Sequence, residues 1–201
     1  MSILFKGLIA ALALCYPFAI YFGLQHFSVR YVAIGLFILL ALRLFMMRSI
    51  LVTHAKSILL PSIVGVLMSA FVIISGGEAH LTLMPVAINA GFFIAFSVSL
   101  LKPPCIIEVL ARLQEPDLPE AGVKYTQKVT VAWCVFFIVL GSLSLYTHFL
   151  GDLKVWTLFN GFIAYVMIGA FGGIEWLIRQ KVKASHLASD LALSKGDVRS
   201  P

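Results

Sequence analysis

Long apolar runs are the feature that most restricts how this chain can fold. Each run has at least 17 residues, about the minimum length of a helix that crosses a bilayer. The six runs are residues 5–24, 31–47, 58–75, 83–101, 129–149 and 155–177. None alternates with the period of two that is typical of a membrane barrel strand. Because backbone polar groups in hydrocarbon must be bonded within the element, we expect an all-α fold with six transmembrane helices arranged as three hairpins.

The composition supports lipid as the solvent. Hydrophobic residues make up 61% of the 201 positions and charged residues only 12%, whereas a soluble domain is about a quarter charged. One core in a chain of this length cannot enclose so much apolar surface. The sequence therefore predicts one transmembrane domain over residues 1–183. The polar residues 184–201 are expected to form a flexible cytoplasmic tail.

The basic residues predict the orientation. With six spans, 13 of the 15 Lys and Arg residues fall on one side, and only Arg30 and Lys154 fall on the other. Cytoplasmic loops carry the excess of basic residues, so both termini are expected in the cytoplasm. The net charge of +6 thus reflects topology. No basic patch with interleaved aromatic residues indicates a nucleic-acid partner.

The loop at residues 102–128 is the only long one on the predicted cytoplasmic side. Its first part has apolar residues at helical spacing, which predicts a short helix lying in the headgroup region. Glu108 and Arg112 are four residues apart on a more polar side of that helix, so we expect them to pair. The apolar positions are Ile106, Val109, Leu110 and Leu113.

The stretch EPDLPE, residues 115–120, comes between this short helix and the fifth span. Pro116 is expected to end the first helix, and Asp117 with Glu120 has the form of a capping box that starts the next. The stretch can also be a docking surface, or a reaction site with carboxylates but no evident nucleophile. The residues that we expect to bind a partner are Glu115, Asp117, Glu120, Lys124, Tyr125 and Lys128.

Three strings in the second half of the chain carry a resemblance to a known family. They are EPDLP at 115–119, GVKYT..VT..WC.FF at 122–137 and W.L.NG..AY at 156–165. Over about residues 105–180 the chain resembles a poorly characterised family of bacterial inner-membrane proteins. That family is associated with gene clusters for aryl-polyene (xanthomonadin-type) pigments, which also encode ketosynthases, acyl carrier proteins and acyltransferases. One departure is Leu140 before Gly141, where the family pattern has Asn-Gly. The resemblance implies a setting, and no catalytic residues come with it.

Isolated polar residues suggest two further sites. His26, His80 and His148 fall near the predicted outer loops, with Glu78 and Asp152 close to them. No pair has metal-ligand spacing, so neither a metal nor another cofactor is predicted. Asn89, Asn160 and Glu175 lie in or at the edge of spans, where they serve either a substrate or helix packing.

Three functions remain open from the sequence. The leading hypothesis is an accessory protein of polyene or lipid-like biosynthesis in the bacterial inner membrane. It would recruit cytoplasmic acyl-carrier enzymes or hand their product to the membrane. The alternative is a small transporter or flippase that acts as a homo-oligomer. The third is a membrane enzyme that uses the carboxylate loop. The chain has no nucleophile elbow, P-loop or dinucleotide fingerprint, which favours a non-catalytic role.

Overall fold

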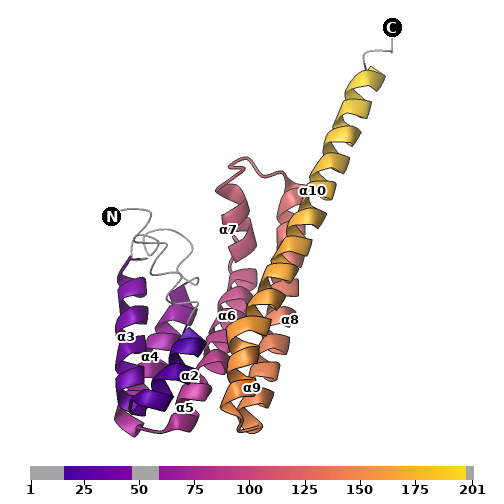
Figure 1. Cartoon of the computed structure of the whole chain (residues 1–201). Coiled ribbons are helices and arrows are strands. Elements are labelled where there is room, and N and C mark those ends of the chain that lie inside the picture. The colour runs from indigo at the N-terminus through magenta and orange to yellow at the C-terminus, as the bar shows by residue number, and fades with distance from the viewer. Residues whose placement is uncertain (1–15, 47–58, 198–201) are drawn as a thin grey trace. The chain divides into compact units, whose positions relative to one another are not determined.

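The computed structural model describes residues 16–46 and 59–197 (Figure 1). The regular elements of these residues are all helices, which confirms the predicted all-α class for this part of the chain. They are α2 (Tyr16–His26), α3 (Val29–Met46), α4 (Leu60–Ser75), α5 (Glu78–Thr82), α6 (Met84–Leu101), α7 (Ile106–Arg112), α8 (Glu120–Phe149), α9 (Leu153–Leu158), the π-helix η3 (Phe159–Ile163) and α10 (Ala164–Asp197). The short helix predicted in the 102–128 loop is present as α7.

Three helical segments of the described residues are long and apolar enough to cross a membrane. They are Ala79–Leu101, Glu120–Phe149 and Leu153–Lys181. Leu60–Ser75 is apolar but shorter, and the first predicted span begins outside the described residues. Six spans therefore stay a prediction.

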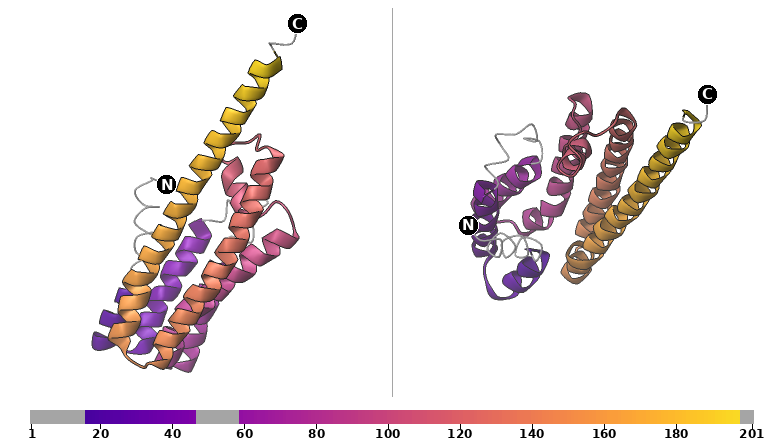
Figure 2. Two further views of the ribbon diagram at one scale, coloured as in Figure 1. Left: turned by 90° about the vertical axis from the view of Figure 1, so that its right-hand side faces the viewer. Right: turned by 90° about the horizontal axis from the view of Figure 1, so that it is seen from above.

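The chain forms two units, residues 1–163 and 164–201. In the first unit α3 packs on α4, α4 on α6 and α6 on α8, so neighbours along the chain are neighbours in space (Figure 2). The short α9 packs on both α2 and α8. The second unit contains α10, whose helical backbone runs through residues 184–197. The predicted domain boundary at residue 183, with a flexible tail beyond it, stays a prediction.

Two separate apolar clusters hold the first unit together. One surrounds Trp156, which is 1% exposed, and draws on α2, α3, α4, α5 and α6. The other joins α6, α7 and α8: Ile106 of α7 packs with aromatic rings of α6 and α8, of which Phe92 and Phe137 are stacked with their centroids 4.9 Å apart. Each cluster lies beside one of the polar sites described below.

The helix α8 buries several small polar residues against its neighbours. Its buried positions recur every three or four residues and include Thr126, Thr130, Ser144 and Thr147. The opposite side is apolar and exposed: Val135 is 56% exposed and Ile138 is 51% exposed. Proteins in water show the reverse distribution, whereas helices in lipid place small polar residues at their contacts.

A glycine allows α4 and α6 to approach closely. A Cβ added to the buried Gly91 would lie 3.2 Å from the Cα of Pro61 and 3.2 Å from Cγ2 of Val64. Because the Cα belongs to the backbone of α4, it cannot move away as a flexible side chain can. Gly91 therefore sets the spacing of these two helices.

Replacing Gly91 by leucine is expected to lower the free energy of unfolding by about 2 kcal/mol, since overpacking forces two helix backbones apart. The measurement is denaturant unfolding of the purified protein in mild detergent. Gly35→Leu is the matched control, because a Cβ at Gly35 meets no atom within 4 Å. Equal losses in the two variants would contradict the close contact at Gly91.

Candidate functional site

The start of α7 is fixed by hydrogen bonds to α6 and α8. The N–H of Ile106 donates to Oγ of Ser99 at 3.2 Å, and that hydroxyl donates to the carbonyl of Phe96 at 2.7 Å. A Ser99 side chain of α6 thus satisfies a backbone donor in the first turn of α7. Sγ of Cys105 lies 3.8 Å from Oγ1 of Thr126 in α8. These contacts hold α7 against both longer helices.

The predicted pair of Glu108 and Arg112 is confirmed. Oε1 of Glu108 lies 2.9 Å from Nε and 2.9 Å from Nη2 of Arg112. Nη1 of the same guanidinium donates to the carbonyl of Pro116 at 3.0 Å. Arg112 therefore ties the turn after α7 back to the helix, and we call the three residues Glu108, Arg112 and Pro116 the arginine clamp.

The arginine clamp turns the polar side of α7 toward the protein. Glu108 is only 5% exposed, whereas Leu110 is 45% and Leu113 is 78% exposed. The predicted apolar face is therefore split: Ile106 is buried and Val109 half-buried, whereas Leu110 and Leu113 are exposed. An outward apolar face is typical of a helix that lies on a membrane surface.

The predicted capping box at Asp117 and Glu120 is wrong. The helix α8 begins at Glu120 with Pro119 as its N-cap, and no side chain makes a capping bond. Pro119 lacks an N–H and has a φ of −66°, which suits a position at a helix start. Glu120 instead pairs with Lys124, with Nζ 2.9 Å from Oε1. The preceding helix α7 already ends at Arg112, before Pro116.

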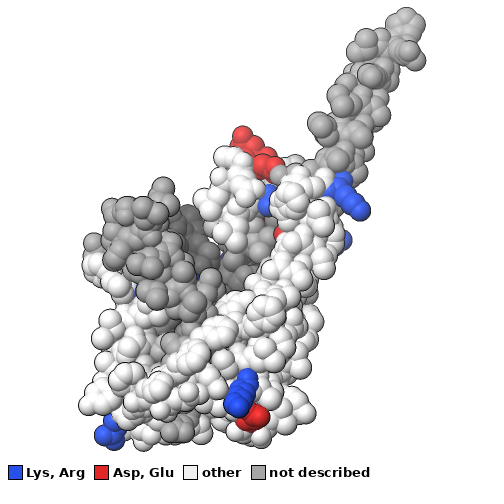
Figure 3. Space-filling model, in the orientation of Figure 1, with Lys and Arg blue, Asp and Glu red and all other residues white. Residues whose placement is uncertain are grey.

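The sequence-predicted partner residues lie at the junction of α7 and α8, and we call them the junction surface. Asp117, Glu120, Lys124 and Lys128 are exposed, and Glu115 and Tyr125 are half-buried. On the face of the first unit in Figure 3, charged side chains gather near the helix ends, and the surface between them is made of other residues. The junction surface thus presents both signs of charge.

Asn160 lies in a network of helix contacts. Its Nδ2 donates to the carbonyl of Trp156 at 3.0 Å and to Oγ1 of Thr147 at 3.3 Å. Its Oδ1 accepts from Oγ of Ser144 at 2.8 Å, and the residue is 4% exposed. These bonds use the whole amide to join η3 to α8, inside the π-helix that replaces a regular turn here.

The other two predicted intramembrane residues lie elsewhere. Nδ2 of Asn89 donates to the carbonyl of Pro85 within α6 at 2.8 Å, and its Cβ faces Gly141 of α8. Glu175 belongs to α10 in the second unit. Within the first unit, none of these hydrogen bonds joins Asn89 to Asn160.

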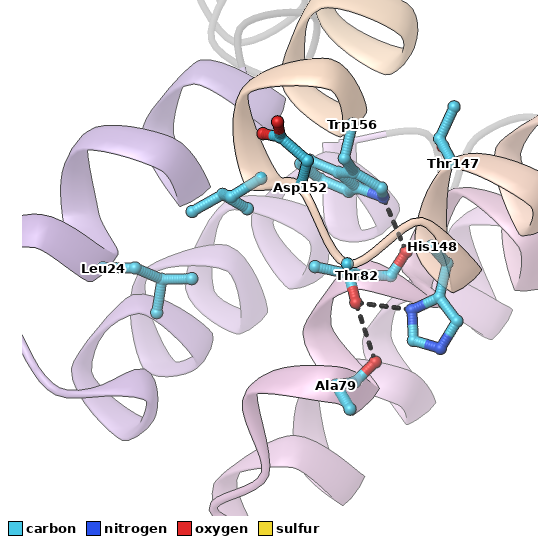
Figure 4. Close-up of a pocket in the computed structure, with 9 residues that line it drawn as sticks. Leu24, Ala79, Thr82, Thr147, His148, Asp152 and Trp156 are labelled. Carbon is cyan, nitrogen blue, oxygen red and sulfur yellow. Dashed lines mark hydrogen bonds between the residues drawn. The ribbon is translucent and has the colours of Figure 1, made fainter.

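A half-open cavity of about 220 Å³ lies among α2, α5, α8 and α9 (Figure 4). Thr82 is one of its lining residues: its Oγ1 donates to the carbonyl of Ala79 at 2.9 Å and lies 2.7 Å from Nδ1 of His148. The indole N–H of Trp156 donates to the carbonyl of Thr82 at 2.9 Å. The lining residues are Leu24, Ala79, Thr82, Thr147, His148, Gly151, Asp152, Leu153 and Trp156.

Sequence reasoning singled out His148 and Asp152 of this cavity but missed Thr82 and Trp156 as partners. The two bonds to Thr82 join residues 66 and 74 positions apart. Only Trp156 had a signal, as the first letter of the W.L.NG..AY string. No local pattern links residues at such separations.

The structure does not gather the histidines into a metal centre. Nδ1 of His80 lies 3.0 Å from Oγ of Ser75, and His26 is exposed. In the part of the chain that the structure describes, no three His, Cys, Asp or Glu side chains come together in an arrangement that could hold a metal ion. The side chain of Glu78, considered with these residues, lies outside the described ones.

Comparison with protein-family models, with curated proteins and with solved structures found no match to this chain. The resemblance to the polyene-associated family therefore stays a prediction.

Proposed function

We propose that this chain is a multi-pass accessory protein of the bacterial inner membrane, with six spans and both termini in the cytoplasm. Three apolar helices, the small polar residues that α8 buries and the apolar residues that it exposes support insertion in lipid. The distribution of 13 basic residues against two supports the orientation. In this orientation the junction surface faces the cytoplasm.

The observation that carries the proposal is the arginine clamp beneath an exposed, charged turn. The buried Glu108 holds Arg112, and Arg112 holds the turn at Pro116. A turn fixed in this way loses little conformational freedom when a partner binds, so more of the contact energy remains as affinity. The junction surface is accordingly built for contact with a soluble partner.

The proposed partners are acyl carrier proteins or the enzymes that carry them, in the assembly of polyenes or related lipid-like products. Acyl carrier proteins are acidic, and Lys124 and Lys128 are exposed. The exposed pair of Lys124 with Glu120 contributes only about 0.3–0.5 kcal/mol, as is usual for such pairs on a helix. A carboxylate of the partner can therefore replace Glu120, and complementary charge speeds the encounter.

The Lys124→Glu, Lys128→Glu variant tests this function. We expect its affinity for purified holo acyl carrier protein to fall at least about tenfold, because two attractions become repulsions. The measurement is retention of the carrier by the membrane protein in nanodiscs. Arg30→Glu, Lys154→Glu, which reverses two exposed basic residues far from the junction in the chain, is the charge-matched control.

Insertion of each variant is checked with a fluorescent fusion at its C-terminus. Normal insertion with unchanged carrier retention in Lys124→Glu, Lys128→Glu would reject the junction surface as the contact. An equal loss of carrier affinity in the control would mean that the change in net charge, and not the junction surface, causes the effect.

The alternative, a small transporter or flippase acting as a homo-oligomer, has less support. It requires polar side chains that face a cavity near mid-membrane. Asn160 is enclosed, and its amide is used by Ser144, Thr147 and Trp156. Those bonds suit a residue that holds helices together.

A further inference from the structure

The cavity at Thr82 opens into a wider, shallow groove across the turn between α8 and α9. The two hollows share Gly151, Asp152 and Leu153. The groove has a volume of about 590 Å³ and extends to Tyr21, Gln25, Leu150 and Lys154. Together they form one depression, which we call the outer groove because it lies at the end predicted to face away from the cytoplasm.

The walls of the outer groove are of two kinds. Leu24, Leu150 and Leu153 supply apolar surface, whereas Thr82 and His148 supply hydrogen-bonding groups. The indole bond to Thr82 and the contact between Thr82 and His148 fix α5, α8 and α9 around the deeper part. A site of this composition and rigidity suits an amphipathic molecule.

The rim of the outer groove carries one charge of each sign. Asp152 and Lys154 are both exposed, and no salt bridge within the described residues includes either of them. Oδ1 of Asp152 accepts from the N–H of Lys154 at 2.8 Å and of Val155 at 3.3 Å. The carboxylate is thereby held in place, and its Oδ2 remains available for a ligand.

We propose that the outer groove binds the headgroup of a phospholipid that carries a primary ammonium beside its phosphate. The ammonium meets the carboxylate of Asp152, the phosphate meets the ammonium of Lys154, and the start of the acyl chains follows the leucines. Asp152 lines both the cavity of about 220 Å³ and the groove of about 590 Å³, and Lys154 lines the groove, so the headgroup is placed where the two hollows meet. In the proposed topology the lipid comes from the outer leaflet. The inference rests on membrane insertion and not on the junction surface.

The test uses the full-length protein in mild detergent and measures its unfolding temperature as lipid is added, because a ligand of the folded state raises that temperature. Short-chain phosphatidylethanolamine is expected to raise it at lower concentrations than phosphatidylglycerol, which lacks the ammonium. Phosphatidylethanolamine is also expected to raise the unfolding temperature at lower concentrations than phosphatidylcholine, whose quaternary ammonium has no N–H to donate. Soluble phosphoethanolamine, without acyl chains, is expected to bind at least about tenfold more weakly.

Two variants test the contribution of each rim charge to lipid binding separately. Asp152→Asn keeps an oxygen that can cap α9, and we expect about tenfold weaker binding of phosphatidylethanolamine, since a hydrogen bond to a charged group is lost. Lys154→Gln is expected to weaken phosphatidylethanolamine and phosphatidylglycerol alike. Lys102→Gln, an exposed lysine outside the groove, is the control.

Three outcomes would overturn the proposal. The first is equal stabilisation by phosphatidylethanolamine and phosphatidylglycerol. The second is an Asp152→Asn variant with unchanged lipid binding. The third is equal binding of soluble phosphoethanolamine, which would remove the role of the acyl chains. Because no acyl carrier protein is present, failure here is independent of failure at the junction surface.

Discussion

Replacing Arg112 by alanine is expected to lower the free energy of unfolding by about 3 kcal/mol, because it leaves a buried carboxylate without its partner. Glu108 is 5% exposed and receives two contacts at 2.9 Å from the guanidinium. The variant also loses the bond from Arg112 to the carbonyl of Pro116. Denaturant unfolding in mild detergent measures the stability. Hydrogen exchange of residues 113–119 reports the released turn.

A double variant identifies the cause of that loss. Adding Glu108→Gln to Arg112→Ala removes the uncompensated charge, so the double variant is expected to be more stable than Arg112→Ala alone. Arg112→Lys should keep a charge contact with Glu108. Its ammonium lacks the planar, forked donors with which the guanidinium bonds both Glu108 and the carbonyl of Pro116. If the single and double variants unfold alike, the buried charge is not what makes Arg112 important.

Replacing Trp156 by alanine is expected to cost about 3–5 kcal/mol, the usual range for removing a large buried aromatic side chain. Trp156 is 1% exposed and packs with Ile20, Leu81 and Met84, which come from three other helices. Loss of the indole leaves a cavity at that contact, and its lining loses van der Waals contacts whether the solvent is water or lipid. The free energy of unfolding measures the effect.

Two further variants separate packing from hydrogen bonding at Trp156. Trp156→Phe keeps most of the ring volume but loses the bond to the carbonyl of Thr82, and we expect it to cost about 1–2 kcal/mol. Trp176→Ala removes the same side chain from an exposed position, where Trp176 is 56% exposed, and should have little effect. A cost at Trp156 no larger than that at Trp176 would contradict the central place of Trp156.

The sequence predicted the features that depend on residues close together in the chain. The helix α7 and its pair of Glu108 and Arg112 follow from spacings of three and four residues. The start of α8 was misplaced because Asp117 satisfied the capping pattern while Pro119 also suits a helix start. Where two local signals compete, the pattern alone does not decide between them.

The sequence could not predict features that depend on which side of a helix is buried. The fifth span is apolar nearly all round, so hydropathy shows that α8 prefers lipid but not that Thr130 and Ser144 face its neighbours. Likewise, the outer groove depends on Thr82, His148 and Trp156 meeting from three helices. In lipid, small differences in packing and hydrogen bonding decide such contacts, and they leave little periodic signal.

The length of α8 has a consequence for the reach of the junction surface. Its 30 residues span about 45 Å at 1.5 Å per residue, whereas the hydrocarbon layer is about 30 Å thick. An upright α8 whose far end, at Phe149, lies at the edge of that layer extends about 15 Å beyond it on the other side. This extension contains Lys124 and Lys128. A soluble partner can then bind at the height of the headgroups or above them without displacing a lipid. In a thicker membrane less of α8 would extend beyond the hydrocarbon layer, so the contact would lie closer to the membrane surface.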